Sequence, residues 1–196
     1  PSIFDRRHVF NTHWYYLLPF GKGQRWAANN TVLDKIVGGW HFAGIMTISS
    51  GQPLCPYNGA GSINYGAPDA FACMLPNSSF KNPGAKVNDT AGDLNIFANP
   101  TAVSTMFRYP LMTTDGRFGY GSIRGLGRWN VDLSFGKTTA ITERIKLTFT
   151  ADFLNAFNHP IFNDPNTDVT DPSSFGVLSS QNNLPRYIQL GFRVQF

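Results

Sequence analysis

The chain contains five stretches in which apolar and polar residues alternate. They cover about residues 7–18, 36–50, 129–138, 145–155 and 185–196. In the last of them, YIQLGFRVQF, every second residue from Ile188 to Phe196 is apolar, and the residues between them are polar or glycine. Successive side chains of a β-strand point to opposite faces, so each stretch predicts a strand with one apolar and one polar face.

The predicted strands are long, and their apolar faces carry aromatic residues near the strand ends. An average strand of a globular sheet has about five or six residues, whereas a strand that crosses a bilayer needs about 9–11. Trp14, Tyr16, Trp40 and Trp129 lie near strand ends, as do the aromatic girdles of membrane barrels. The pattern favours a membrane barrel over the alternative, a half-buried sheet in a soluble sandwich.

The connections between the strands differ in length. TTAITER, between the third and fourth strands, is short, and residues 19–35 form a connection of middling length. Residues 51–128 and 156–184 form long connections rich in Gly, Pro, Asn, Asp and Ser. Outer-membrane barrels have short periplasmic turns and long extracellular loops. We therefore predict an all-β fold, an antiparallel transmembrane β-barrel segment with five long strands and two long extracellular loops.

Composition supports this interpretation. Of the 196 residues, 14% are charged and 14% are aromatic, whereas about 25% of the residues of a soluble domain are charged. The chain lacks the apolar runs of about 18 or more residues that mark membrane helices. The net charge of +4 is spread along the chain rather than gathered in the basic patch of a nucleic-acid-binding protein. We therefore expect no nucleic-acid partner.

Cys55 and Cys73 are the two cysteines of the chain. Two thiols without a nearby histidine are too few for a four-ligand zinc site, and the four histidines do not have the spacing of metal ligands, so we predict no metal site. The pair predicts a disulfide in the first long loop, in an oxidising compartment, in preference to two unpaired thiols.

The remaining polar groups form no catalytic pattern. GYGSIRGLG lacks the glycine spacing of a phosphate-binding loop, and no G-x-S-x-G elbow occurs. Asp132 and Asp152 fall on the polar faces of neighbouring strands. Three basic residues lie close to them in the sequence: Lys137, Arg144 and Lys146. Compensated charges explain the two carboxylates better than an acid/base pair, and we predict neither an enzyme nor a bound cofactor.

The segment FNHPIFNDPN, which follows the fourth strand, predicts a turn. Pro160 and Pro165 are expected to end the strand, because proline cannot donate a backbone hydrogen bond. Asn158, Asn163 and Asp164 are expected to bond to backbone groups nearby in the sequence.

Several segments together resemble the C-terminal part of TonB-dependent outer-membrane receptors. They are DRRHVFNTHWYYLLPFGKG, IVGGWHFAGIMTISSGQPL, GSIRGLGRWNVDLSFGKTTAITERIKLTFTADFLNAFNHPIF and the final strand. The combination of RGxGxWNxDxSxxK with ITERxxLxFxxxFxNxFNHPxF is specific. The likeness is to the Oar-like group, common in acidobacteria, whose members carry a carboxypeptidase-regulatory-like domain before the plug. It covers nearly the whole chain except about residues 58–108.

The resemblance implies a barrel of about 22 strands in the bacterial outer membrane, closed by an N-terminal plug. Such receptors import scarce solutes with energy passed from the TonB complex. The plug and the TonB-contacting segment are then expected upstream of Pro1, and the chain is expected to be a fragment, the C-terminal part of the barrel. The implied partners are outer-membrane lipid, the TonB complex through the plug, and an unidentified small solute.

The end of the chain also fits the signal that the barrel-assembly machinery reads in this family. The matching positions are Gln189, Gly191, Val194 and Phe196. The alternative is an ordinary terminal edge strand. If the signal is present, the assembly machinery is a further partner, and Phe196 is an assembly determinant.

Ligand contacts are expected in the long loops, residues 51–128 and 156–184, through aromatic residues. We select Tyr57, Tyr65, Phe71, Phe107 and Tyr109. Two other functions stay open at this point. One is a surface barrel that acts in adhesion or as a structural protein without transport, and the other is a secreted soluble β-domain that binds carbohydrate.

Overall fold

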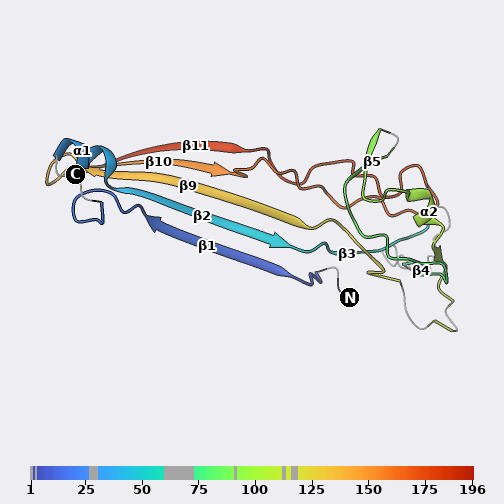
Figure 1. Ribbon diagram of the computed structural model, residues 1–196. Coiled ribbons are helices and arrows are strands. Elements are labelled where there is room, and N and C mark those ends of the chain that lie inside the picture. The colour runs from blue at the N-terminus through green and yellow to red at the C-terminus, as the bar shows by residue number, and fades with distance from the viewer. Residues whose placement is uncertain are drawn as a thin grey trace. The chain divides into compact units, whose positions relative to one another are not determined.

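The structure is a computed structural model of the 196-residue chain, which describes residues 2, 4–26, 31–59, 73–90, 92–111, 114–115 and 119–196 (Figure 1). The chain divides into two compact units. The strand unit contains Phe10–Ile48, Trp129–Pro160 and Leu184–Phe196, and the loop unit contains Pro1–Val9, Ser49–Arg128 and Ile161–Asn183.

The strand unit is built on one five-stranded sheet in the order β1-β2-β9-β10-β11. Its strands lie side by side in Figure 1 and are β1 (Val9–Leu17), β2 (Trp40–Ser49), β9 (Arg128–Ala140), β10 (Lys146–Leu154) and β11 (Tyr187–Gln195). The β9–β10 and β10–β11 pairs are antiparallel. The prediction of an all-β antiparallel fold is confirmed, and the sheet is open, with β1 and β11 at its edges.

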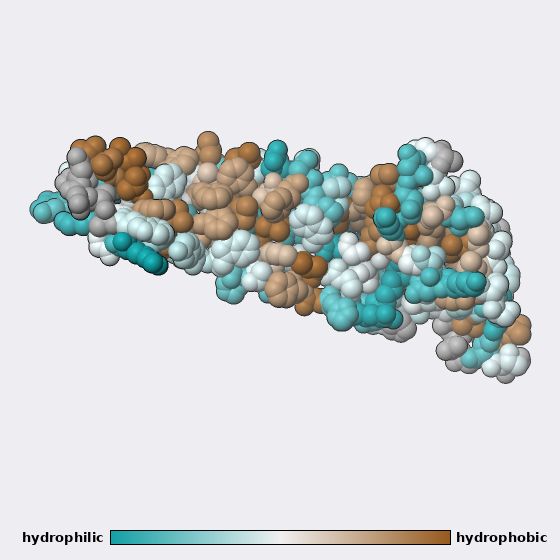
Figure 2. Space-filling model, viewed as in Figure 1, coloured by the Kyte–Doolittle hydropathy of each residue, from teal (hydrophilic) through white to brown (hydrophobic). Residues whose placement is uncertain are grey.

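The strand register separates an apolar face from a polar face. Phe149 of β10 lies opposite Phe192 of β11, and the next rung pairs Thr150 with Gly191. On the apolar face, the ring of Phe135 lies 4.7 Å from that of Phe42. Phe135 and Phe149 are exposed, and Phe192 keeps 70% of its surface accessible. Figure 2 shows hydrophobic side chains gathered over the strands.

Two glycines inside the strands allow bulky neighbours to lie flat on the sheet. A Cβ atom at Gly44 would lie 2.2 Å from the Trp14 ring, and one at Gly136 would lie 2.1 Å from the His41 ring. Both distances are far below van der Waals contact. The strands therefore need glycine at these positions so that an aromatic side chain of the next strand can cover the backbone.

The expected strand over residues 36–50 is wrong in its first part. A short helix, α1 (Thr31–Val37), occupies its beginning, and β2 starts at Trp40. The Gly38 amide donates to the Asp34 carbonyl, 2.8 Å away, and closes the helix. Gly39 then adopts a φ of 73°, a left-handed conformation that suits glycine after a helix. The other four strands end within two residues of their expected bounds.

The long loops are folded rather than irregular. Beside α2 (Pro100–Ser104), they contain short strands in three pairs: β3 (Pro53–Leu54) with β8 (Ile123–Arg124), β4 (Leu75–Pro76) with β7 (Phe107–Arg108), and β5 (Asn88–Thr90) with β6 (Asp93–Asn95). The loop unit has its own core, made of Leu54, Met74, Ile96, Phe97, Val103, Phe107, Ile123, Phe175 and Leu178. Both loops contribute to this core, so they form one packed body.

In the part of the chain that the structure describes, no helix is both long and apolar enough to cross a membrane.

Candidate functional site

The loop unit is held together by groups from its two long segments. Asn95, which is 2% exposed, donates from Nδ2 to the carbonyl of Phe175 at 2.8 Å, across 80 positions of sequence. The rings of Phe97 and Phe175 stack with centroids 5.4 Å apart. The Arg124 guanidinium pairs with the Asp5 carboxylate at 2.6 Å. A surface built on this core is preorganised, which lowers the entropy cost of binding a ligand.

Cys55 and Cys73 form a disulfide in the loop unit, with their Cα atoms 5.0 Å apart. Backbone hydrogen bonds support both sides of it: Met74 N donates to the Pro56 carbonyl at 2.7 Å, and Gly119 N donates to the Cys73 carbonyl at 2.9 Å. The crosslink therefore fixes the start of the first long loop to the part of that loop that enters the core.

Among the expected ligand contacts, Tyr57 lies in the loop unit, in the first of the two long loops. It is partly buried, and its hydroxyl donates to Asn166 Oδ1 at 3.4 Å. Burial and the charge of Asp168 raise the pKa of Tyr57, so the phenol stays protonated and can donate. Hydrogen bonds between the backbones of Tyr57, Thr167 and Val169 join the two long loops at this point.

Asp168 is the charged group of this region. It accepts hydrogen bonds from the Gly59 amide at 2.9 Å and from the Thr170 hydroxyl at 2.6 Å. Burial alone would raise the pKa of Asp168, but these hydrogen bonds outweigh it and lower the pKa. The carboxylate is therefore ionised and structural, because it closes a turn of each loop.

The other expected contacts have different outcomes. Tyr109 is exposed, beside the bidentate ion pair of Arg108 and Asp115, whose two N–O distances are both 2.7 Å. Phe107 is only 7% exposed, and its ring packs 5.7 Å from that of Phe80. The expectation that Phe107 contacts a ligand is wrong, because it belongs to the core. Tyr65 and Phe71 lie outside the described residues.

The polar face of the sheet carries the two carboxylates. Asp152 accepts from the Ser134 hydroxyl at 2.5 Å. Asp132 accepts from Asn130 Nδ2 at 2.9 Å and from the Asn155 amide at 2.8 Å. Their hydrogen-bond partners are hydroxyl and amide groups, not the expected lysines and arginine. A pocket of about 250 Å³ adjoins this face and is lined by residues that include both carboxylates.

Lys137 does not face Asp132 or Asp152, which corrects the expected charge compensation. It lies opposite Phe149 in the register, on the apolar face, and its ammonium group donates to two backbone carbonyls. Among the described residues, no three His, Cys, Asp or Glu side chains gather in a way that could hold a metal ion.

The turn after β10 is held by asparagines through contacts that sequence inspection missed. Asn155 is 7% exposed and has a φ of 49°. Its side-chain nitrogen Nδ2 donates to the His159 carbonyl at 3.2 Å and to the Leu184 carbonyl at 3.1 Å. Asn158 accepts from the Arg186 amide at 2.9 Å. These bonds fix the start of β11 against the end of β10.

Asn163 and Asp164 also act at long range. Asn163 donates to the Ser180 hydroxyl at 2.8 Å, and Asp164 binds Gln52 and Arg128. The expectation of local backbone bonds is wrong for these side chains and for Asn158. The two asparagines of LNAFNHP, Asn155 and Asn158, were the available signal, because asparagine tolerates the positive φ angles that both adopt better than most residues.

The positions of the expected assembly signal lie in or directly after β11. Gln189 lies opposite Asp152, and Val194 lies opposite Leu147 on the apolar face. A Cβ atom at Gly191 would lie 2.5 Å from the Thr150 hydroxyl oxygen. Phe196 is fully exposed. Among the strands that the structure describes, β11 pairs with β10 alone, so the strand with these residues presents an open hydrogen-bonding edge.

A family model described as an outer membrane beta barrel domain matches residues 1–189. Neither the curated proteins nor the solved structures contain a match to the chain.

Proposed function

Because the chain belongs to the outer membrane beta barrel domain family, we propose that it is the C-terminal barrel portion of a TonB-dependent receptor that imports a small solute. The family places the protein in the bacterial outer membrane. In the proposal, the apolar face of the sheet is in contact with lipid and the long loops lie outside the cell. Beyond this localisation, we propose that the protein takes up a small solute with energy supplied by the TonB complex.

The observation that carries the proposal is the folded loop unit. For a barrel that served only as a membrane anchor, short connections between the strands would be sufficient. Here two long loops form one body with a shared core, a disulfide and an internal ion pair. Preorganised extracellular loops are suited to selecting a ligand before it enters a barrel.

A second observation concerns the size of the barrel. The sheet has five strands, and its edge strands β1 and β11 have one neighbour each. A closed barrel gives every strand two neighbours, so the complete barrel requires further strands. This requirement agrees with the resemblance of the strand motifs to large receptors of about 22 strands.

The experiment uses the full-length protein purified from outer membranes. An affinity tag is inserted at Gly92, in the β5–β6 turn, where the space around the Cα atom is open. The immobilised protein is then incubated with the purified periplasmic domain of TonB. We expect retention of the TonB domain, and mass spectrometry of the tagged polypeptide should recover peptides of a plug. A protein that retains no TonB and contains no plug would instead be a surface barrel without transport, acting in adhesion or structure.

The proposal includes the barrel-assembly machinery as a partner of β11. The open edge of β11 can pair transiently with another strand before it closes the barrel, and Phe196 is exposed beside it. Deletion of Phe196 from the full-length protein should lower its outer-membrane level several-fold, whereas Phe196→Tyr, which keeps a terminal aromatic residue, should not. Unchanged levels after the deletion would exclude Phe196 as an assembly determinant.

A further inference from the structure

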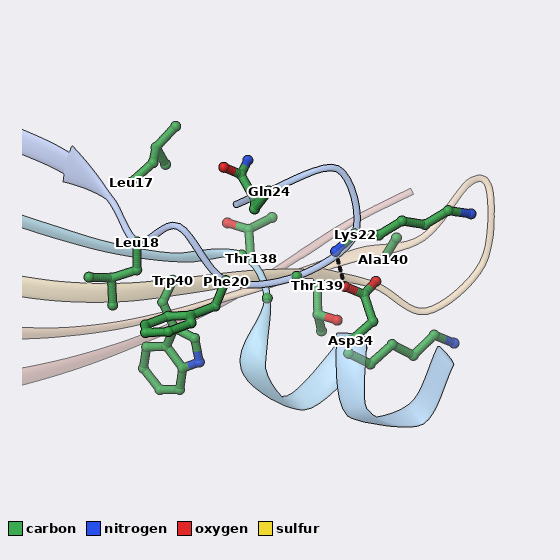
Figure 3. Close-up of a pocket in the computed structure, with 14 residues that line it drawn as sticks. Leu17, Leu18, Phe20, Lys22, Gln24, Asp34, Trp40, Thr138, Thr139 and Ala140 are labelled. Carbon is green, nitrogen blue, oxygen red and sulfur yellow. Dashed lines mark hydrogen bonds between the residues drawn. The ribbon is translucent and has the colours of Figure 1, made fainter. Parts of the chain in front are cut away.

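The helix α1 has one polar and one apolar side. Its apolar side chains Val32, Leu33, Ile36 and Val37 are all exposed, Leu33 by 53% and Ile36 by 59%. At 100° per residue, these four positions cover one continuous side of the helix. Asp34 lies on the other side and accepts a hydrogen bond from the Lys22 amide, as Figure 3 shows. A helix in water would normally have the opposite arrangement, with its apolar side buried.

The C-terminal end of α1 is attached to the apolar face of the sheet. The Trp40 indole donates to the Ile36 carbonyl at 3.1 Å. The Lys137 ammonium donates to the carbonyls of Ile36 and Gly38, both at 2.7 Å. It also lies 4.9 Å from the centroid of the Trp40 ring. Since Lys137 lies opposite Phe149, these contacts place the helix end on the same side as the exposed phenylalanines.

The C-terminal end of the helix is attached to interior strands of the sheet. Its anchors Trp40 and Lys137 come from β2 and β9, which are interior strands. Lys35 reaches the carbonyl of Ile141, in the turn between β9 and β10, at 3.5 Å. Strands that complete the barrel would join at β1 and β11, so they would not cover this anchored end of the helix. A plug lies inside a barrel, on the polar side, and would not reach it either.

We propose that α1 is an interfacial anchor that lies in the phospholipid headgroup region of the periplasmic leaflet, with its apolar side toward the acyl chains. The surface that faces the bilayer is continuous with the helix through Trp40 and Lys137. Figure 2 shows hydrophobic atoms gathered over α1, and Figure 1 places α1 at the end of the sheet that also holds the C-terminus. By connectivity, this is the end opposite the extracellular loops.

The charges around the helix fit this position. The connection from Pro19 to Gly39 carries Lys22, Arg25 and Lys35 against the single acid Asp34. Basic side chains near a membrane surface bind lipid phosphate groups, and tryptophan is enriched at the same depth. Lys137 extends its apolar stem over the sheet and places its ammonium group at the helix carbonyls, so its charge is satisfied within an apolar surface.

The experiment measures the depth of single spin labels in the full-length protein, reconstituted in vesicles of phosphatidylethanolamine and phosphatidylglycerol. Cysteines are introduced as Leu33→Cys, Ile36→Cys and Lys35→Cys, one at a time, with other free thiols replaced by serine. The native pair Cys55–Cys73 is already bonded and takes no label. At Leu33 and Ile36, collisions with oxygen should exceed those with a water-soluble nickel complex, whereas at Lys35 the nickel complex should dominate.

Two controls calibrate this measurement. Phe192→Cys reports the lipid-facing strands, and Leu94→Cys reports an exposed apolar site of the loop unit in water. If the label at Ile36 collides with oxygen and the nickel complex in the same proportion as the label at Leu94, the helix faces water. If the label at Ile36 is protected from both reagents, protein covers the helix. Either result would overturn the proposal. Because no transport is measured, the outcome is independent of the proposed receptor function.

Discussion

Phenylalanine occupies opposite environments in the two units of this chain. In the loop unit, Phe97 and Phe175 are 2% and 0% exposed and stack in a core. In the strand unit, Phe10 and Phe192 stand on the surface of the sheet. The loop unit thus removes its apolar surface from water by packing against itself, as a soluble domain does. The strand unit leaves this surface for the lipid. The two units should therefore respond to different perturbations.

The largest effect is expected from Phe97→Ala. The substitution opens a cavity in the core of the loop unit and should lower its free energy of unfolding by about 3–5 kcal/mol. Limited proteolysis of the full-length protein in increasing urea measures this loss. The matched control Leu94→Ala, at an exposed position nearby, should stay within about 0.5 kcal/mol of the natural protein. Equal losses for both variants would show that the loop unit has no cooperative core.

Removal of the disulfide should weaken the same unit. Cys55 and Cys73 are separated by 18 positions, and the double replacement by serine should cost the loop unit about 3 kcal/mol. The strands carry no part of this crosslink, so the heat-dependent gel mobility of the barrel should not change. A parallel loss of barrel stability would contradict the independence of the two units.

A charge on the lipid-facing surface tests the strand unit. Phe149→Arg should destabilise the full-length barrel in vesicles by about 2–4 kcal/mol, because the arginine must enter the bilayer. Its neighbour Thr148 points to the polar face and bonds to the Thr138 hydroxyl at 3.2 Å, so Thr148→Arg should cost about 1 kcal/mol or less. Guanidinium unfolding of the two variants in vesicles measures both losses of stability. Equal sensitivity of the two positions would mean that the faces have been assigned wrongly.

The smallest effect concerns acid. The pKa of Asp168 in the folded loop unit lies below its ordinary value of 3.8. Its ionised form therefore stabilises the fold above that pH, and the contribution is lost as the pH falls through the folded pKa. Asp168→Asn should make the stability of the loop unit less dependent on pH between about pH 6 and about pH 3. Limited proteolysis of the natural protein and the variant at both pH values measures the stability of the loop unit. An unchanged pH dependence would assign the acid sensitivity to other carboxylates.

The strands were predictable because their signal is local. In β10 and β11, the alternation of side chains is regular, and the register between these two strands pairs apolar with apolar residues, as at Phe149 and Phe192. The start of β2 was not predictable in this way. Ile36 and Val37 extend the apolar pattern toward Trp40. However, the helix α1 ends at Val37, and the two glycines between Val37 and Trp40 connect it to the strand β2.

The loop unit was less predictable, because its contacts join distant segments. Phe107 was selected as an aromatic residue of a long loop, and nothing in its neighbourhood in the sequence indicates the core that contains it. That core depends on Phe97 and Phe175, from different loops. Polar contacts follow the same rule, since the partners of Asn163 and Asp164 are remote in the sequence. Composition marked the loops as irregular, and long-range packing gave them structure.

The hydrogen bond from Asn95 to Phe175 has a consequence for biosynthesis. The two residues belong to segments that lie before β9 and after β10, so the chain must complete both strands before this contact can form. Contacts of such high sequence separation form late, because loop closure must precede them. The loop unit is therefore a late product of assembly, and it should mature only after the β9–β10 hairpin has been made.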